Sequence, residues 1–173
     1  MKQIHASRSL GAWLLLGSLL LLRPLAGTAA DYKPESYRYE LASGGVGANE
    51  STLYRVVCYV KTPPEAEAVA AECAVHGIIF SGSSAANGNA AQTPLCKAAS
   101  LSNEQLAFFD RFFGKKEYKS YVVAVAKNSM RVTKLKKEYK VEIIVSVNKR
   151  KLRRDLEQAG MVEKLGSALD SQS

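Results

Sequence analysis

Five cations occupy six consecutive positions near the C-terminal end of the chain: Lys149, Arg150, Lys151, Arg153 and Arg154. Asn148, directly before them, is a residue type that often begins a helix. A helix start disfavours positive charge, because the first backbone N–H groups already carry partial positive charge. One interpretation is a bound anion: a phosphate backbone, an acidic polysaccharide, a lipid headgroup or an acidic protein. The alternative is a solvated face that Asp155 and Glu157 partly neutralise.

Positive charge extends well beyond this cluster. Residues 115–154 carry 14 Lys and Arg side chains, against only Glu117, Glu138 and Glu142. So uneven a distribution indicates a basic face, and residues 134–154 are a candidate surface for an anionic polymer or a membrane. Aromatic side chains that would stack on bases do not alternate with these cations. We therefore expect no sequence-specific nucleic acid partner.

Other residues that carry chemistry give weaker signals. His76 could act as a general base, but the sequence has no recognisable nucleophile or carboxylate motif to complete a catalytic set. A packing role beside a helix end is the favoured interpretation. Gly44, Gly45 and Gly47 weakly resemble a phosphate-binding loop, but no helix follows to hold an anion, so a hairpin loop is favoured. We predict no catalytic residue, no metal and no cofactor.

Three cysteines follow the first thirty residues: Cys58, Cys73 and Cys96. In an oxidising compartment three cysteines allow one disulfide and one remaining thiol. Three pairings are possible, because Cys96 falls in a loop that could reach either Cys58 or Cys73, and Cys73–Cys96 is the favoured pair. Three unpaired and mostly buried thiols are the alternative. Metal binding is not expected, because the cysteines form no CxxC motif.

The first thirty residues have the pattern of a secretory signal peptide. Lys2 and Arg8 form a basic head, residues 10–22 are mostly apolar, and residues 26–30 are small. The apolar run is shorter than the roughly 20 residues of a membrane span. We expect cleavage after Ala30, or alternatively after Ala29, and export to the periplasm or the cell exterior. A lipoprotein is not expected, because no cysteine lies near the cleavage region.

Hydrophobic periodicity then indicates the elements that position these residues. Alternating apolar residues predict strands over 37–41, 53–61 and 139–147. Residues 121–126, apolar on both faces, predict a central strand, and residues 130–138 predict a polar edge strand. A short buried strand is predicted at residues 78–80. Helices are predicted from Thr62 to Gly77, from Ser102 to Gly114 and after Asn148. Ser102 and Gln105 have the spacing of a capping box.

These elements predict an α+β fold. We expect a two-layer sandwich, with a mainly antiparallel sheet of about five strands and three helices packed on one face. Residues 31–165 form the predicted single domain, and residues 166–173 a disordered tail. Residues 81–100 are rich in Ser, Ala, Gly and Asn and are predicted to be a flexible low-complexity loop.

Two stretches resemble a known group of proteins. Residues 74–80 (AVHGIIF) and residues 137–160, which carry KEYKV, VSVN and a following LR and LEQAG, are similar to an uncharacterised family of secreted Bacteroidetes proteins. The resemblance covers roughly residues 37–165. It implies a location in a Gram-negative cell envelope, and it implies no catalytic residue because the family has no established activity.

The function expected from the sequence is that of a non-enzymatic envelope protein. It would bind another envelope component or assemble with itself. The second hypothesis is a binder of anionic polymer or membrane surface through residues 134–154. The third is an enzyme of unknown class that uses His76.

Overall fold

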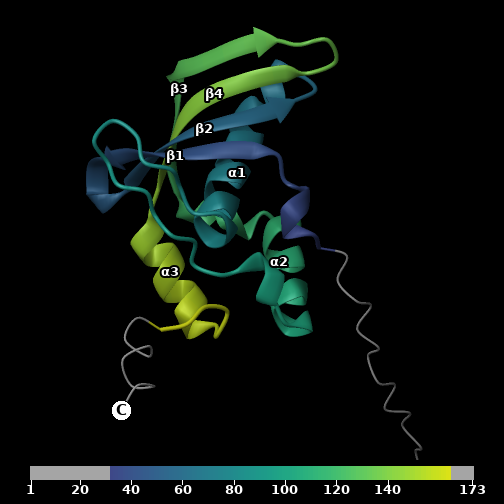
Figure 1. Ribbon diagram of the computed structural model, residues 1–173, viewed down its shortest axis with the longest axis vertical. Coiled ribbons are helices and arrows are strands. Elements are labelled where there is room, and N and C mark those ends of the chain that lie inside the picture. Colours follow the sequence, from purple (N-terminus) through teal and green to yellow (C-terminus); the bar gives the residue numbers. More distant parts are fainter. Residues whose placement is uncertain (1–31, 165–173) are drawn as a thin grey trace, which may run out of the picture.

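The computed structural model describes residues 32–164, which form three α-helices and a four-stranded antiparallel sheet. The α+β fold predicted from the sequence is confirmed, with four strands rather than about five. In chain order the elements are β1 (Tyr39–Val46), β2 (Thr52–Val60), α1 (Ala66–Phe80), α2 (Asn103–Gly114), β3 (Val122–Lys134), β4 (Tyr139–Val147) and α3 (Lys149–Gln158). Figure 1 shows the β3–β4 hairpin at the end of the molecule opposite α2 and α3.

The sheet has the strand order β1-β2-β4-β3, so β2 and β4 are central. Alternation along these two strands directs one set of side chains into the core. On β2 this set includes Tyr54, Val56 and Cys58, and the facing residues of β4, Val145, Ile143 and Val141, are fully buried. The core lies between this face and the helices, with α1 packed directly against β2 and β4.

Helix α1 corrects two predictions. The sequence placed its end at Gly77 and a short strand at residues 78–80, but the helix continues to Phe80. Gly77 serves close packing instead, because a Cβ there would lie 2.7 Å from Leu41 Cδ2. Two residues after the last helical residue, Phe80, Gly82 has a positive φ of 73° and donates its N–H to the Gly77 carbonyl, which terminates the helix.

Helix α2 begins as its sequence predicts. The Ser102 hydroxyl accepts a hydrogen bond from the Gln105 N–H at 3.2 Å, and the Gln105 side chain accepts one from the Ser102 N–H at 2.9 Å. This reciprocal pair is the capping box. The buried face of the helix carries Phe109, Phe112 and Phe113. The helix ends at Gly114, as expected.

Strand β3 corrects the sequence interpretation of residues 121–138. A central strand over 121–126 and a separate edge strand over 130–138 were expected, but residues 122–134 form one strand at the edge of the sheet. Residues 127–130 bulge out opposite Ile143. The Ser129 hydroxyl bridges this gap, since it accepts a hydrogen bond from the Ile144 N–H and donates one to the Ala126 carbonyl. Merging the two expected strands accounts for part of the lower strand count.

Residues 81–100 lie beside the other edge of the sheet. Ser84 forms a parallel bridge with Ala42, and its N–H donates to the Leu41 carbonyl at 2.9 Å. Ser83 pairs in turn with Gln92. The sequence argument for flexibility relied on the scarcity of apolar side chains, whereas these anchors are backbone hydrogen bonds. The flexibility of this segment stays a prediction.

Candidate functional site

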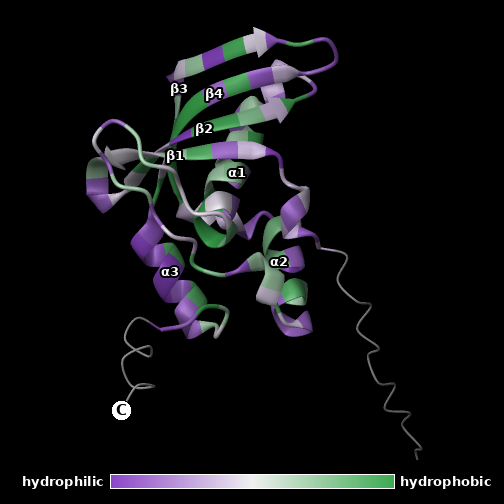
Figure 2. Cartoon of the chain, in the orientation of Figure 1, coloured by the Kyte–Doolittle hydropathy of each residue, from purple (hydrophilic) through white to green (hydrophobic). Residues whose placement is uncertain are grey.

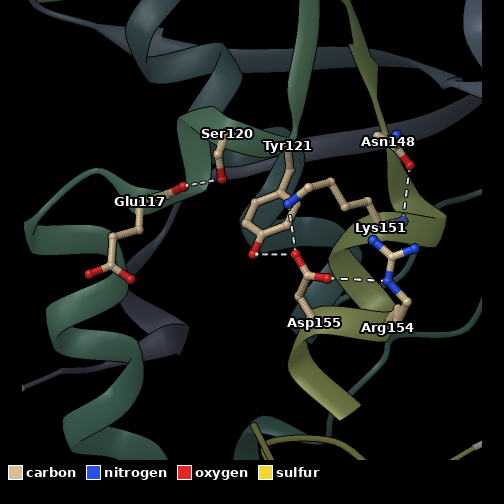
Figure 3. Close-up of polar contacts among 7 residues, drawn as sticks. All are labelled: Glu117, Ser120, Tyr121, Asn148, Lys151, Arg154 and Asp155. Atoms are coloured by element: carbon tan, nitrogen blue, oxygen red, sulfur yellow. Dashed lines mark hydrogen bonds and ion pairs between the residues drawn. The ribbon is translucent and has the colours of Figure 1, made fainter. Parts of the chain in front are cut away.

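The predicted basic cluster lies on α3, with Asp155 at its centre (Figure 3). The Asp155 carboxylate accepts hydrogen bonds from Lys151 Nζ at 2.7 Å, Tyr121 Oη at 3.3 Å and Arg154 Nε at 3.4 Å. These donors, Lys151 above all, hold the pKa of Asp155 below its ordinary value. Lys151 Nζ also lies 4.3 Å from the centre of the Tyr121 ring. A local network therefore holds two of the five predicted cations.

The other cations of the cluster also have partners. Arg153 Nε donates to Glu157 at 2.7 Å, one helical turn away, and Arg150 pairs with Glu50 from the β1–β2 connection. The structure thus brings an acid or another acceptor to every cation of the predicted cluster on α3, including Lys149, which contacts Gln92. This arrangement agrees with the alternative interpretation, a partly neutralised solvated face.

The capping of α3 explains how its first turn tolerates this charge. The Asn148 side chain accepts a hydrogen bond from the Lys151 N–H at 2.9 Å. This bond satisfies one of the free backbone donors at the helix start. The carboxylates that offset the cations come from Asp155 and Glu157 further along the helix and from Glu50. A bound anion is not needed to balance the helix start.

Lys149 differs from the rest of the cluster because it points inward. Its Nζ donates to Gln92 Oε1 at 2.5 Å, and the Tyr54 hydroxyl donates to the same oxygen at 3.0 Å. Burial, and then the charge of Arg153, lower the pKa of Lys149. Lys149 therefore ties α3 to the segment of residues 81–100, which is a structural role.

A second group of cations lies at the far end of the β3–β4 hairpin. We call it the lysine tip and define it by the lysines at the end of β3, in the turn and at the start of β4: Lys134, Lys136, Lys137 and Lys140. Among residues 32–164 no hydrogen bond or ion pair engages these four side chains. The unpaired positive charge within segment 134–154 therefore lies at this tip rather than on α3.

The same hairpin exposes apolar side chains. Among residues 32–164, four of the five large hydrophobic residues that are exposed lie on β3 or in the turn after it, and we call them the β3 apolar surface: Val123, Met130, Val132 and Leu135. Figure 2 shows hydrophobic and hydrophilic residues alternating along β3. Sequence reasoning did not identify this surface. In the sequence, Met130, Val132 and Leu135 are interspersed with cations, and this pattern was interpreted as a polar edge strand.

His76 lies in an aromatic cluster rather than in an open cleft. Its side chain is 1% exposed, and its ring stacks on Tyr37 with centroids 3.8 Å apart. Its Nδ1 is hydrogen-bonded to Tyr39 Oη at 2.8 Å, and its Nε2 is buried with no partner. Burial lowers the pKa of His76 to about 3. This position suits packing, because a substrate would have no path to the free ring nitrogen.

The three cysteines are free thiols in the structure, so the Cys73–Cys96 disulfide is not formed there. Cys58 and Cys73 are buried between the sheet and α1, whereas Cys96 is partly exposed and lines a surface pocket of about 900 Å³. Burial raises the pKa of Cys58 to about 11 and raises that of Cys73 as well. This state corresponds to the alternative of unpaired thiols.

Two further observations concern residues 32–164 alone. No group of three or more His, Cys, Asp or Glu side chains is placed there to hold a metal ion. No helix in this part of the chain has the length and apolar character needed to span a membrane. Comparisons with protein-family models, with curated proteins and with solved structures found no match to this chain.

Proposed function

We propose that this protein is an exported, non-enzymatic component of the cell envelope that binds another envelope protein. The signal-peptide pattern of residues 1–30 and the resemblance to secreted Bacteroidetes proteins support the location. The burial of His76 supports a role without catalysis. The binding surface in this proposal is the β3 apolar surface.

One observation carries the proposal. Large exposed apolar side chains are concentrated on a single strand and the turn that follows it, while the same types of side chain elsewhere are mostly buried. Met130, Val132 and Leu135 lie within six residues of one another toward the end of the hairpin, and exposed apolar side chains grouped in this way are typical of protein interaction sites. The bulges at Val123 and at residues 127–130 break the regular pairing of β3 with β4, so β3 is not a regular strand along which another strand could pair. A partner is therefore expected to pack on the side chains rather than to extend the sheet.

The test compares apolar side chains on two strands. The double variant Met130→Gln, Val132→Thr makes the β3 apolar surface polar, and the control Val46→Thr makes the same kind of change at a residue that is 84% exposed on β1. Affinity capture of the exported protein from its own envelope, read by mass spectrometry, should identify a protein that the double variant loses and the control retains. Equal capture by the double variant and the wild type would refute the proposal.

Self-assembly is the second form that this binding could take. Sedimentation of the purified wild type and of the double variant distinguishes it from binding to another protein. A dimer that the double variant converts to a monomer would identify the partner as a second copy of the chain.

A second candidate function, the binding of an anionic polymer or a membrane through residues 134–154, is favoured by a separate observation. Within the described residues 32–164 the lysine tip has no internal partner, whereas the α3 cations are paired. The part of the segment that remains available to an anion is therefore residues 134–140.

A further inference from the structure

The lysine tip is formed by a tight turn. The Leu135 N–H donates to the Glu138 carbonyl at 2.8 Å, which closes the turn and places Lys136 and Lys137 at its apex. Both apical lysines and Lys134 are exposed. This end of the hairpin is distant from α2 and α3 (Figure 1), so it can approach a surface without obstruction by either helix.

The carboxylates nearest to the tip are already held by arginines. Glu138 accepts two hydrogen bonds from Arg38, at 2.8 and 3.2 Å. Glu142 lies 3.5 Å from Arg55 and 3.7 Å from Arg131. These acids therefore do not neutralise the lysines, and the tip presents four compact positive charges to an external anion.

Apolar side chains accompany the charge. Leu135 is 37% exposed and lies between Lys134 and Lys136 in the chain, and Val132 on the same hairpin is 43% exposed. A soluble polyanion offers no apolar phase to these side chains. A lipid bilayer offers both anionic headgroups for lysines and an apolar layer for a side chain at the apex.

From this combination we propose that the lysine tip docks the protein on the surface of an anionic lipid bilayer. The ammonium groups contact headgroup phosphates, and Leu135 enters the interface between headgroups and acyl chains. The contact is peripheral and reversible, since it uses a few side chains at the end of one hairpin. It rests on the second candidate function, which it narrows to a bilayer, and it uses different cations from the predicted α3 cluster. It shares Leu135 and Val132 with the β3 apolar surface, but no protein partner is needed for it.

The experiment measures binding of the mature chain to vesicles of equal parts phosphatidylglycerol and phosphatidylcholine by co-sedimentation. The tip variant is Lys134→Gln, Lys136→Gln, Lys137→Gln. Each lysine near an anionic surface contributes about a fivefold change in partitioning, so the three together should weaken binding by about a hundredfold. Added salt should weaken wild-type binding, because exposed charges are screened.

A matched control removes the same charge from α3 through Arg150→Gln, Arg153→Gln, Arg154→Gln. It should bind vesicles much more like the wild type than the tip variant does, and circular dichroism checks that both variants fold. Wild-type binding by the tip variant would overturn the proposal. Equal losses in both variants would also overturn it, because net charge alone would then explain binding.

The effect of removing the apolar Leu135 side chain distinguishes binding to a bilayer from binding to a soluble polyanion. Leu135→Ser should reduce vesicle binding severalfold and leave retention on a heparin column unchanged, since heparin has no apolar layer. If Leu135→Ser binds vesicles as the wild type does while the tip variant loses heparin retention, the ligand is a soluble anionic polymer and the bilayer proposal fails.

Discussion

At the scale of single residues, Gly77 lies where α1 passes closest to β1. A methyl group at this position would lie 2.7 Å from Leu41 Cδ2 and 3.0 Å from Tyr39 Cε2. We predict that Gly77→Ala lowers the free energy of unfolding by about 1–3 kcal/mol, because overpacking outweighs the gain in helix propensity of about 1 kcal/mol. Urea unfolding measures the change.

Gly114 provides the matched control for this substitution. It also lies in a helix, but a Cβ there would meet nothing within 4 Å. Gly114→Ala should leave stability unchanged or raise it by less than about 1 kcal/mol. A Gly77→Ala protein as stable as Gly114→Ala would show that the close approach of α1 to β1 is wrong.

His76 predicts a specific pH dependence of stability. Its folded-state pKa of about 3 is below the ordinary value of 6.5, so between these pH values the unfolded chain binds more protons. The neutral side chain therefore contributes its full stability above about pH 6.5, and this contribution is lost progressively as the pH falls toward 3. The slope from one such group is at most about 1.4 kcal/mol per pH unit.

His76→Gln isolates this contribution, because glutamine can hydrogen-bond to Tyr39 but does not titrate. Unfolding in urea at a series of pH values gives the two stability curves, and their difference cancels the titration of the carboxylates. We expect the wild type to lose stability more steeply than the variant below about pH 6.5. Parallel curves over this range would mean that the histidine is not buried in its neutral form.

At the scale of the elements, the start of α2 depends on one side chain. Ser102→Ala removes the hydroxyl that accepts from the Gln105 N–H, and we predict a loss of about 1 kcal/mol of stability. Ser100→Ala is the control, because the Ser100 hydroxyl is exposed and bonds only to the Lys97 carbonyl. Its effect should stay within about 0.5 kcal/mol in thermal unfolding. Equal losses in both variants would contradict a specific capping role.

Some elements could be predicted from the sequence and others could not, depending on whether the residues that define them are close together in the chain. The cap of α2 is encoded within four residues, so its sequence signal is local and was correct. The position of β3 in the sheet depends on residues that are remote in the chain. Val122–Ala126 is apolar on both faces, as is typical of a central strand, yet it pairs with another strand, β4, along one edge only. Gly77 was misassigned for a similar reason, because the contact that requires a glycine comes from β1.

The partners of the cations at the candidate site could not be predicted from the sequence, for the same reason. The partners of Arg150 and Lys149 are Glu50 and Gln92, which are remote in the chain and are brought close by the β1–β2 connection and by the segment of residues 81–100. Only the pairs within one or two turns, such as Arg153 with Glu157, can be predicted from helical spacing. Local charge counting therefore placed the free cations on α3 instead of at the lysine tip.

At the scale of the whole molecule, the predicted cleavage site of the signal peptide lies next to a residue that packs in the folded domain. Tyr32, two residues after Ala30, stacks on Phe113 with ring centroids 5.6 Å apart and also faces Phe109. Tyr32, which the predicted cleavage would leave as the second residue, is therefore part of the aromatic cluster that packs α2 against α1. N-terminal sequencing of the protein from its native cell should give Asp31, or Ala30 for cleavage after Ala29.

The stability of trimmed chains measures how much the folded domain depends on Tyr32. A protein trimmed to begin at Lys33 loses the Tyr32 ring and should be less stable than one beginning at Asp31 by about 1–3 kcal/mol. Tyr32→Phe keeps the ring and removes a buried hydroxyl that has no partner, so it should be neutral or stabilising. Recovery of Met1 in the native protein would contradict cleavage near Ala30, and equal stability of the trimmed chain would contradict a stabilising role for the Tyr32 ring.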